Sequence, residues 1–259
     1  MKICVLIKQV PDKDSPITIS EDNLSITDNN ITWVSNESDN YALEEALIIK
    51  EKNQAEVVVC TLGNESARQV LKDAMAKGAD RGIFISDEKF NSIDILTMAK
   101  VFTSVLKEEN FDLFLSGLQS DDQGNSQLGI LIAELLKISH ASLVMSTNLE
   151  ENNKIKVKRE LEGGWFQWTT LNLPASISIQ SGINTPRYAT LKGIMMVKNK
   201  IVNEINSSSV QEIDLTSNIQ LNKISIPEKS KETIYLDGTT EEITDKLVKI
   251  LKNDIKVIN

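Results

Sequence analysis

A polar loop with glycines near both ends, residues 117–129, is the segment best suited to binding chemistry. It follows an apolar run at 112–116 and precedes a helical pattern at 126–137. Free backbone N–H groups at such a helix start, with Asn125 or Ser126 as the cap, form an anion site. Phosphate is the expected anion, since amides and hydroxyls can hold it without a lysine. Taken alone, a solvated strand-to-helix connection is an equally good interpretation.

Two other loops are candidates for the same edge of a sheet. Residues 36–39 (Asn-Glu-Ser-Asp) precede a helical pattern, and a capping role for Ser38 or Asp39 is favoured unless neighbouring loops also bind. Residues 63–66 lack the lysine and second glycine of a phosphate-binding P-loop. No Gly-x-Gly-x-x-Gly follows the first apolar run either. Neither ATP hydrolysis nor a standard dinucleotide site is therefore predicted.

Catalytic and metal-binding patterns are not found in the sequence. His140 is the single histidine, and no carboxylate or cysteine is patterned around it. Cys4 and Cys60 each lie in an apolar run without C-x-x-C spacing, so we expect buried, reduced thiols in a reducing compartment. We predict no catalytic residues and no metal site.

Charge and the N-terminal segment exclude further classes of function. The chain of 259 residues has a formal net charge of -9, which argues against nucleic acid as a partner. The first apolar run is too short for a signal sequence, and no stretch has the length of a membrane span. We therefore expect a bacterial cytoplasmic protein.

The elements that must position these loops alternate between short apolar runs and helical patterns. This alternation predicts βαβ units and a doubly wound, mainly parallel, Rossmann-like α/β sheet. Amphipathic helical faces lie between the runs, and the helix at 67–77 should end at Gly78. The predicted strands are residues 3–10, 56–61, 82–86, 112–116 and 141–145.

An antiparallel extension and an arm follow the parallel part. Alternating segments at 155–160, 165–171 and 175–179 predict antiparallel strands, the first two joined by a hairpin turn at Gly163-Gly164. After residue 186 the chain has little core of its own until a last helix at about 241–252. We expect a nucleotide-binding α/β domain at 1–193 and an arm at 194–259 that packs on another chain.

Five landmarks, in order along the chain, carry a resemblance to a known family. They are residues 43–46 (Leu-Glu-Glu-Ala), 76–81 (Ala-Lys-Gly-Ala-Asp-Arg), Gly117 with Gln119, 159–164 (Arg-Glu-Leu-Glu-Gly-Gly), and 184–191 (Asn-Thr-Pro-Arg-Tyr-Ala-Thr-Leu). With them the chain resembles the electron-transfer flavoprotein β subunit. The resemblance implies a non-enzymatic electron carrier: a heterodimer whose α subunit holds most of the FAD, while β contributes a structural AMP site.

The resemblance also implies site residues. Position by position, AMP would contact the end of the first strand, the loop at 36–39, the end of the second strand and the loop from residue 117. These residues are Leu6, Asn36, Glu37, Ser38, Asp39, Leu62, Gly117, Gln119, Asp122, Asn125, Ser126, Gln127 and Leu128. The chain departs from the family where a basic residue commonly follows Gly117, since Leu118 stands there.

Partner recognition is implied at residues 188–191 (Tyr-Ala-Thr-Leu). Leu191 matches an exposed leucine that inserts into a pocket of a partner dehydrogenase, with Tyr188 beside it. Without the resemblance, a leucine packed on the sheet is the better interpretation. Residues 159–164, 179–184 and 226–229 are most similar to the branch that partners trimethylamine dehydrogenase in methylotrophic bacteria, and an acyl-CoA dehydrogenase-like donor is the other possibility.

Two further functions stay open from the sequence. One is the β subunit of an electron-bifurcating flavoprotein, with a second FAD in place of AMP. The other is a free-standing nucleotide-binding module that needs no partner. The cofactor content and the oligomeric state of the purified protein distinguish the three.

Overall fold

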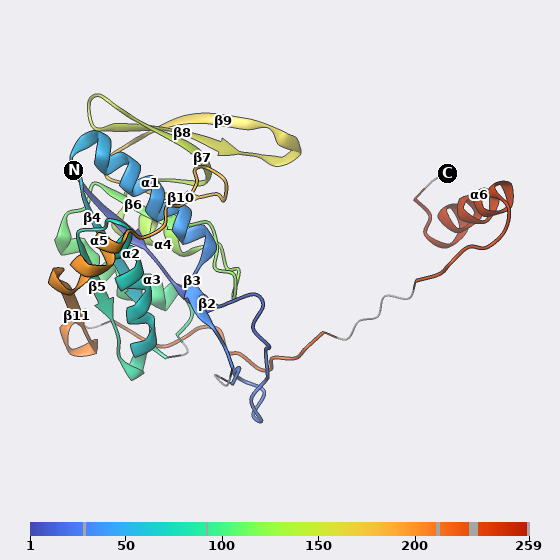
Figure 1. Ribbon diagram of the computed structural model, residues 1–259, viewed down its shortest axis with the longest axis horizontal. Helices are drawn as coiled ribbons and strands as arrows, with labels where there is room; N and C mark the ends of the chain where they lie inside the picture. Colours follow the sequence, from blue (N-terminus) through green and yellow to red (C-terminus); the bar gives the residue numbers. More distant parts are fainter. Residues whose placement is uncertain (28–29, 92, 211–212, 228–232, 258–259) are drawn as a thin grey trace.

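A single nine-stranded sheet forms the centre of the chain (Figure 1). The computed structural model describes residues 1–27, 30–91, 93–210, 213–227 and 233–257. Across the sheet the strands are β11 (Val202–Ile205), β5 (Arg81–Ile85), β4 (Glu56–Leu62), β1 (Lys2–Leu6), β6 (Leu113–Gly117), β10 (Ala175–Ile179), β7 (Ser139–Glu150), β8 (Lys154–Glu160) and β9 (Phe166–Asn172). All neighbours from β11 to β7 are parallel, and β7, β8 and β9 are antiparallel.

Helices cover both faces of the sheet. The side chains of α1 (Glu37–Asn53) and α2 (Arg68–Lys77) belong to one apolar core, and those of α3 (Ile95–Leu106) and α4 (Leu128–Leu136) to the other. In β1, Ile3 and Val5 face the first core, while Cys4 and Leu6 face the second. Strands that are buried on both faces consist of continuous apolar runs, and the sequence shows such runs at the parallel strands. The predicted doubly wound fold is confirmed.

The first strand is shorter than predicted. The expected strand at 3–10 divides into β1, which ends at Leu6, and β2 (Gln9–Pro11), which pairs with β3 (Trp33–Ser35) in a separate two-stranded sheet. The chain leaves the main sheet at Ile7 and Lys8, and Ile7 N–H donates to the Cys60 carbonyl of β4 at 3.0 Å. This exit brings Lys8 to the carboxyl end of the sheet.

The antiparallel prediction for residues 175–179 is wrong. This segment is β10, which lies between β6 and β7 and is parallel to both. Its alternating serines suggested one solvated face, yet all five residues are buried. Ser176 Oγ donates to the carbonyl of Gly129 in α4 at 2.9 Å, so the polar face packs against a helix instead of water.

The rest of the antiparallel extension is as predicted. Strands β8 and β9 form a hairpin whose turn holds Gly163 at φ 69° and Gly164 at φ 78°. Ile155 and Val157 on β8 are fully buried in the core that α1 also lines. Similarly, α2 ends at Gly78, whose N–H donates to carbonyls of the last turn.

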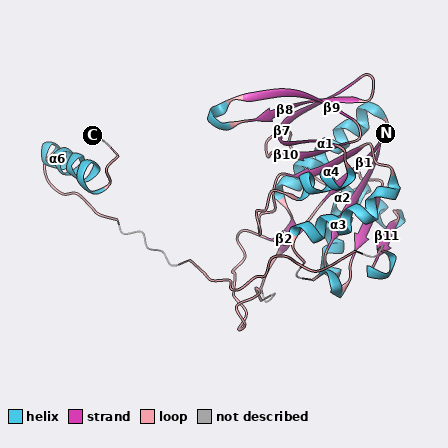
Figure 2. Cartoon of the chain, turned by 180° about the vertical axis from the view of Figure 1, so that it is seen from behind, coloured by secondary structure: helices cyan, strands magenta, loops and turns pink. Residues whose placement is uncertain are grey.

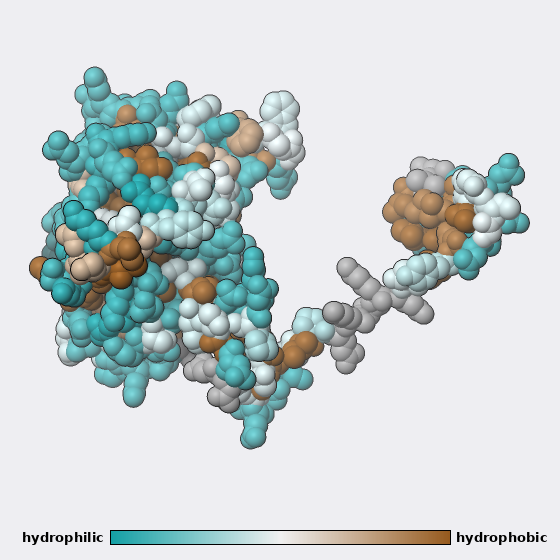
Figure 3. Space-filling view, in the orientation of Figure 1, coloured by the Kyte–Doolittle hydropathy of each residue, from teal (hydrophilic) through white to brown (hydrophobic). Residues whose placement is uncertain are grey.

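Residues beyond 193 first return to the body of the protein. The helix α5 (Leu191–Met196) contacts α2, and β11 then adds an unpredicted edge strand beside β5. The last helix, α6 (Thr240–Lys249), overlaps the range predicted at about 241–252 and lies away from the sheet (Figures 1 and 2). Figure 3 shows a hydrophobic cluster at this end of the chain, where Leu247 and Val248 are exposed. The division of the chain at residue 194 stays a prediction.

The described residues show neither a membrane-spanning helix nor a cluster of metal ligands. Within the described ranges, no helix combines the length and the apolar character that crossing a bilayer requires. The same residues contain no group of three or more His, Cys, Asp or Glu side chains that could hold a metal ion.

The two thiols should be chemically silent in the folded protein. Cys4 and Cys60 have no exposed surface, and burial raises the pKa of both thiols well above its ordinary value. Because the thiolate is the nucleophile, we expect an aromatic disulfide reagent to titrate no rapidly reacting thiol in the native protein. The same reagent should titrate both of the chain's cysteines after denaturation in guanidinium chloride. Rapid native reaction would mean that the strands carrying them open readily.

Candidate functional site

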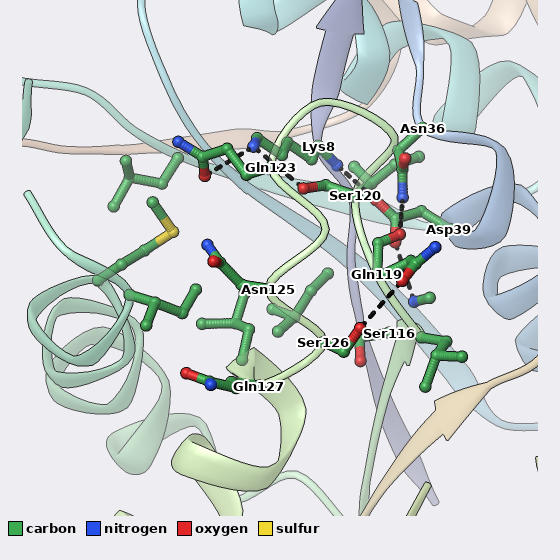
Figure 4. A pocket seen from close by; sticks show the side chains of 18 of the residues that line it. Lys8, Asn36, Asp39, Ser116, Gln119, Ser120, Gln123, Asn125, Ser126 and Gln127 are labelled. Carbon is green, nitrogen blue, oxygen red and sulfur yellow. Dashed lines mark hydrogen bonds between the residues drawn. The ribbon is translucent and has the colours of Figure 1, made fainter. Parts of the chain in front are cut away.

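A pocket lies at the carboxyl ends of β1 and β6, between helices that leave the sheet on opposite faces (Figure 4). Such a switch point is where open α/β sheets bind ligands. The hollow is partly open to solvent. Its walls come from the end of β1, the start of α1, the end of β4, α3 and the loop between β6 and α4.

Asp39 joins the two strands that border the pocket. Its side chain is buried and accepts the Lys8 N–H at 2.8 Å and the Gly117 N–H at 2.9 Å. Gly117 is the last residue of β6, and Lys8 lies two residues beyond the end of β1, so one carboxyl group bridges the switch point. A Cβ on Gly117 would lie 2.5 Å from Asp39 Oδ1 and 2.1 Å from Ser38 Oγ, so only glycine fits there.

The start of α1 fastens the loop after β6. The Asn36 side-chain amide donates to the Gln119 carbonyl at 2.9 Å and accepts the Asp121 N–H at 2.9 Å, and Ser38 Oγ donates to the same carbonyl at 2.6 Å. Asn36 occupies the N-cap position, but its own side chain makes no capping hydrogen bond; Asp121 Oδ2 accepts the N–H of Glu37, the first residue of the helix, at 3.2 Å. The predicted capping by Ser38 or Asp39 is therefore wrong, because both side chains bond across to the neighbouring loop.

Lys8 supplies a cation that sequence reasoning missed. Its Nζ lies 2.7 Å from Asp122 Oδ1, 3.2 Å from Gln123 Oε1 and 3.4 Å from Ser120 Oγ. The side chain lines the pocket and points into the loop, as Figure 4 shows. Leu118 follows Gly117 in the loop, and Lys8, from the segment after β1, lies at the same pocket. The strand predicted at 3–10 included Lys8, so its place at the carboxyl end of the sheet became visible only with the end of β1 at Leu6.

The remainder of the loop reaches α4 without a side-chain cap. Gln127, not Asn125 or Ser126, is the N-cap residue of α4, and it makes no capping hydrogen bond, so the predicted caps are wrong. Ser126 adopts φ 56° and donates from Oγ to Gln119 Oε1 at 3.1 Å. The side chains of Asn125 and Gln127 extend toward the cavity in Figure 4.

An apolar wall faces this polar loop. Ile95, Met98 and Phe102 of α3 line the pocket, together with Leu62 from the end of β4. The amphipathic pattern of α3 indicates only that these residues face the core. Their contribution to the pocket wall could not be predicted from it. Ser116 Oγ also lines the pocket, is buried, and has no hydrogen-bond partner among the described residues. A buried hydroxyl of this kind is available to a ligand.

The structure collects most of the predicted nucleotide residues at this one pocket. Glu37, Ser38 and Asp122 do not line it: Glu37 is exposed, Ser38 bonds to the loop, and Asp122 pairs with Lys8. Those that do line it are Leu6, Asn36, Asp39, Leu62, Gly117, Gln119, Asn125, Ser126, Gln127 and Leu128.

The predicted docking residues and the histidine lie elsewhere. Tyr188 is 94% exposed and Leu191 is 82% exposed, and both belong to the segment that leads into α5. The interpretation of Leu191 as a sheet-packed residue is therefore excluded. His140 is an exposed residue of β7 and does not line the pocket.

Known proteins share this sequence over its length. A family model described as "Electron transfer flavoprotein domain" matches residues 23–210. A protein of Methylophilus methylotrophus named electron transfer flavoprotein subunit beta is 34% identical, with 99% of each chain covered. The chain belongs to the electron transfer flavoprotein β-subunit family. The resemblance inferred from the five landmarks is thus confirmed.

Relatives in this flavoprotein family come from distant organisms. Electron transfer flavoprotein subunit beta of Bacillus subtilis is 31% identical over the whole of both chains. The mitochondrial subunit beta of Arabidopsis thaliana is 33% identical, again over the full lengths. The match is therefore to complete β subunits and not to an isolated module.

The buried carboxyl group gives the fold a specific pH dependence. Burial raises the pKa of Asp39 from 3.8 to about 7, despite the two backbone N–H donors and Lys8. Between these pKa values the unfolded chain has lost a proton that the folded chain keeps, so stability falls as the pH rises toward 7. The loss is complete above pH 7 and amounts to about 4 kcal/mol, since one pKa unit corresponds to about 1.4 kcal/mol.

Asp39→Asn should remove this part of the pH dependence. The amide cannot ionise, so the denaturation midpoint of the variant should fall less than that of the wild type between pH 5 and 8, measured by urea titration on the purified protein. Asp73→Asn, at an exposed position of α2, is the control and should follow the wild type. Parallel curves for all three proteins would show that Asp39 is already ionised in the folded state at pH 5.

Proposed function

We propose that this chain is the β subunit of a heterodimeric electron-transfer flavoprotein and holds a structural AMP in the pocket at the switch point. The observation that carries the proposal is the pocket itself, which combines an apolar wall, a polar loop and one lysine at the carboxyl ends of β1 and β6. Membership of the family supports the electron-carrier role.

The residues present fit an adenine nucleotide. The faces of adenine are apolar, and Ile95, Met98 and Phe102 offer a matching wall. Phosphate needs N–H and O–H donors and a cation. The loop supplies backbone amides, the Ser126 hydroxyl and amide side chains, while Lys8 supplies the charge. The unpartnered Ser116 hydroxyl is a further group that a ligand would satisfy.

The redox chemistry belongs to FAD, held mainly by the α subunit. When bound, this flavin would supply the electron transfer between a dehydrogenase and a second acceptor. The chain described here contributes architecture and docking and acts as a carrier subunit without catalytic residues of its own. The donor is a flavin dehydrogenase, trimethylamine dehydrogenase-like or acyl-CoA dehydrogenase-like, in the bacterial cytoplasm.

Two surfaces support these partners. The helix α6 belongs to the predicted arm at 194–259, and its exposed apolar residues Leu247 and Val248 would become buried on the α subunit. Leu191, with Tyr188 nearby, would enter an apolar pocket of the dehydrogenase. A single exposed anchor with a nearly neutral surround is typical of small, transient interfaces.

Cofactor content tests the proposal directly. We expect the complex co-expressed with the α subunit to release one FAD and one AMP per heterodimer on chromatography of the denatured protein.

Lys8→Gln should lower the affinity for AMP about tenfold, since one charge-assisted hydrogen bond contributes roughly 1.5–3 kcal/mol. Lys72→Gln, at an exposed site on α2, is the matched control.

Each other outcome of this experiment contradicts a defined part of the proposal. Two FAD and no AMP would identify a bifurcating flavoprotein with a second flavin in the pocket. An unchanged AMP affinity in Lys8→Gln would remove the lysine from the site. A stable monomer without flavin would refute the carrier function for this chain.

Truncation of the docking leucine should weaken recognition alone. For the Leu191→Ala heterodimer we expect the KM for the partner dehydrogenase to rise about tenfold, because truncating a buried anchor costs on the order of 1–2 kcal/mol. The flavin content should stay that of the wild type. Leu24→Ala, at another exposed leucine, should have no effect on either quantity. Equal KM values for both variants would place the docking site elsewhere.

A further inference from the structure

The exposed segment around Leu191 is held from both sides by buried contacts. At its start, Asn184 Nδ2 donates to the Tyr41 carbonyl at 3.1 Å and to Glu45 Oε2 at 3.0 Å. Three residues later, Arg187 binds the Glu44 carboxylate of α1. Its backbone N–H and its Nε donate to Oε2 at 3.0 and 2.9 Å, and its Nη2 donates to Oε1 at 2.9 Å. The segment is thereby fixed to α1 through side chains and backbone together.

Glu44 is an unusual group to find at this place. Only 8% of its side chain is exposed, and both carboxylate oxygens accept from Arg187. The Glu44 and Glu51 carboxylates raise the pKa of Arg187 above its already high ordinary value, so the guanidinium stays charged. A largely buried ion pair gains little net stability over a well-packed apolar pair. The two parallel hydrogen bonds between the planar guanidinium and the carboxylate instead fix the orientation of Arg187 relative to α1.

The far side of the segment is anchored on α2. A Cβ on Gly193 would lie 2.1 Å from the Ala76 carbonyl oxygen, so α5 contacts the end of α2 at backbone distance. Thr190 caps α5 by accepting the Gly193 N–H at 3.0 Å. Lys200 donates to the carbonyls of Met75 and Ala79 at 2.8 and 2.6 Å. The two anchors enclose the most exposed apolar side chains of this region: Tyr188, Leu191 and Met195.

We propose that Glu44 and Arg187 are positioning residues for partner recognition. The pair holds the segment 188–196 in its docking geometry before the dehydrogenase arrives. A recognition segment that is already ordered loses less conformational entropy on binding, and affinity rises without any new contact to the partner. Neither side chain needs to touch the dehydrogenase. The inference rests on the proposed function and adds to it the source of the segment's rigidity.

Glu44→Gln and Arg187→Lys in the assembled heterodimer test the proposal. Both lose the bidentate pair, since an amide carries no charge and an ammonium cannot bond as a fork. We expect faster hydrogen exchange in residues 188–196 and a KM for the dehydrogenase about threefold to tenfold higher, with kcat unchanged. FAD and AMP content should remain at the wild-type level.

Glu51→Gln is the matched control. Glu51 bonds the same guanidinium, but 60% of its side chain is exposed, so its loss should leave both readouts close to the wild type. Arg187→Lys keeps a cation at the site, and it supplies the answer if Glu44→Gln does not assemble.

The outcomes separate this inference from the function on which it rests. Faster exchange in 188–196 with an unchanged KM would overturn the positioning role, provided that Leu191→Ala does raise the KM. An unchanged KM in Leu191→Ala as well would refute the docking function itself. Unchanged exchange in both variants would show that the α2 anchor alone holds the segment, which also overturns the proposal.

Discussion

The buried carboxyl group of Asp39 is the interaction on which the site depends. At a switch point, neighbouring parallel strands send their chains to opposite faces, and the backbone N–H groups beyond the strand ends lose their partners in the sheet. Asp39 accepts one such N–H from Lys8 and another from Gly117. It thereby closes the base of the crevice without filling it. A side chain at Gly117 would occupy the space of this carboxyl group, so the two residues require each other.

The two characters of the pocket follow from this geometry. On the α1 face, Asn36 and Ser38 use their polar atoms to hold the loop after β6, and polar residues of this loop, among them Asn125 and Gln127, line the cavity. On the other face, α3 presents the edge of an apolar core through Met98 and Phe102. A ligand with an apolar ring and an anionic group matches this division, and neither half of the site requires a catalytic residue.

Sequence reasoning succeeded where one periodicity had one physical cause and failed where two causes give the same pattern. Continuous apolar runs are typical of strands buried on both faces, and these strands were located correctly, although the first ends at Leu6 and not at residue 10. The alternation of Ser and Ile in β10 is compatible with two structures: a strand with one face in water, or a strand whose serines hydrogen-bond to a helix. The hydrogen bond from Ser176 to the Gly129 carbonyl shows that the second is correct, and the sequence alone does not contain this information. The prediction of helix caps failed for a similar reason. Ser38 and Asp39 bond to residues far away in the sequence, and capping rules consider only neighbouring residues. Lys8 was missed because its three contacts lie more than a hundred residues away along the chain.

The landmarks that revealed the family are contacts of one another. Residues 43–46 contain two glutamates, Glu44 and Glu45, that α1 buries, and a buried carboxylate requires donors. Those donors are Arg187 and Asn184, from the landmark at 184–191. The landmark at 76–81 supplies the carbonyl groups against which α5 and Lys200 are placed. Three stretches far apart in sequence therefore form one structural unit, which joins the helix that borders the pocket to the exposed segment around Leu191. Glu44 and Glu45, which weaken the amphipathic pattern of the α1 sequence, are therefore buried polar contacts of this unit and not part of a solvated face.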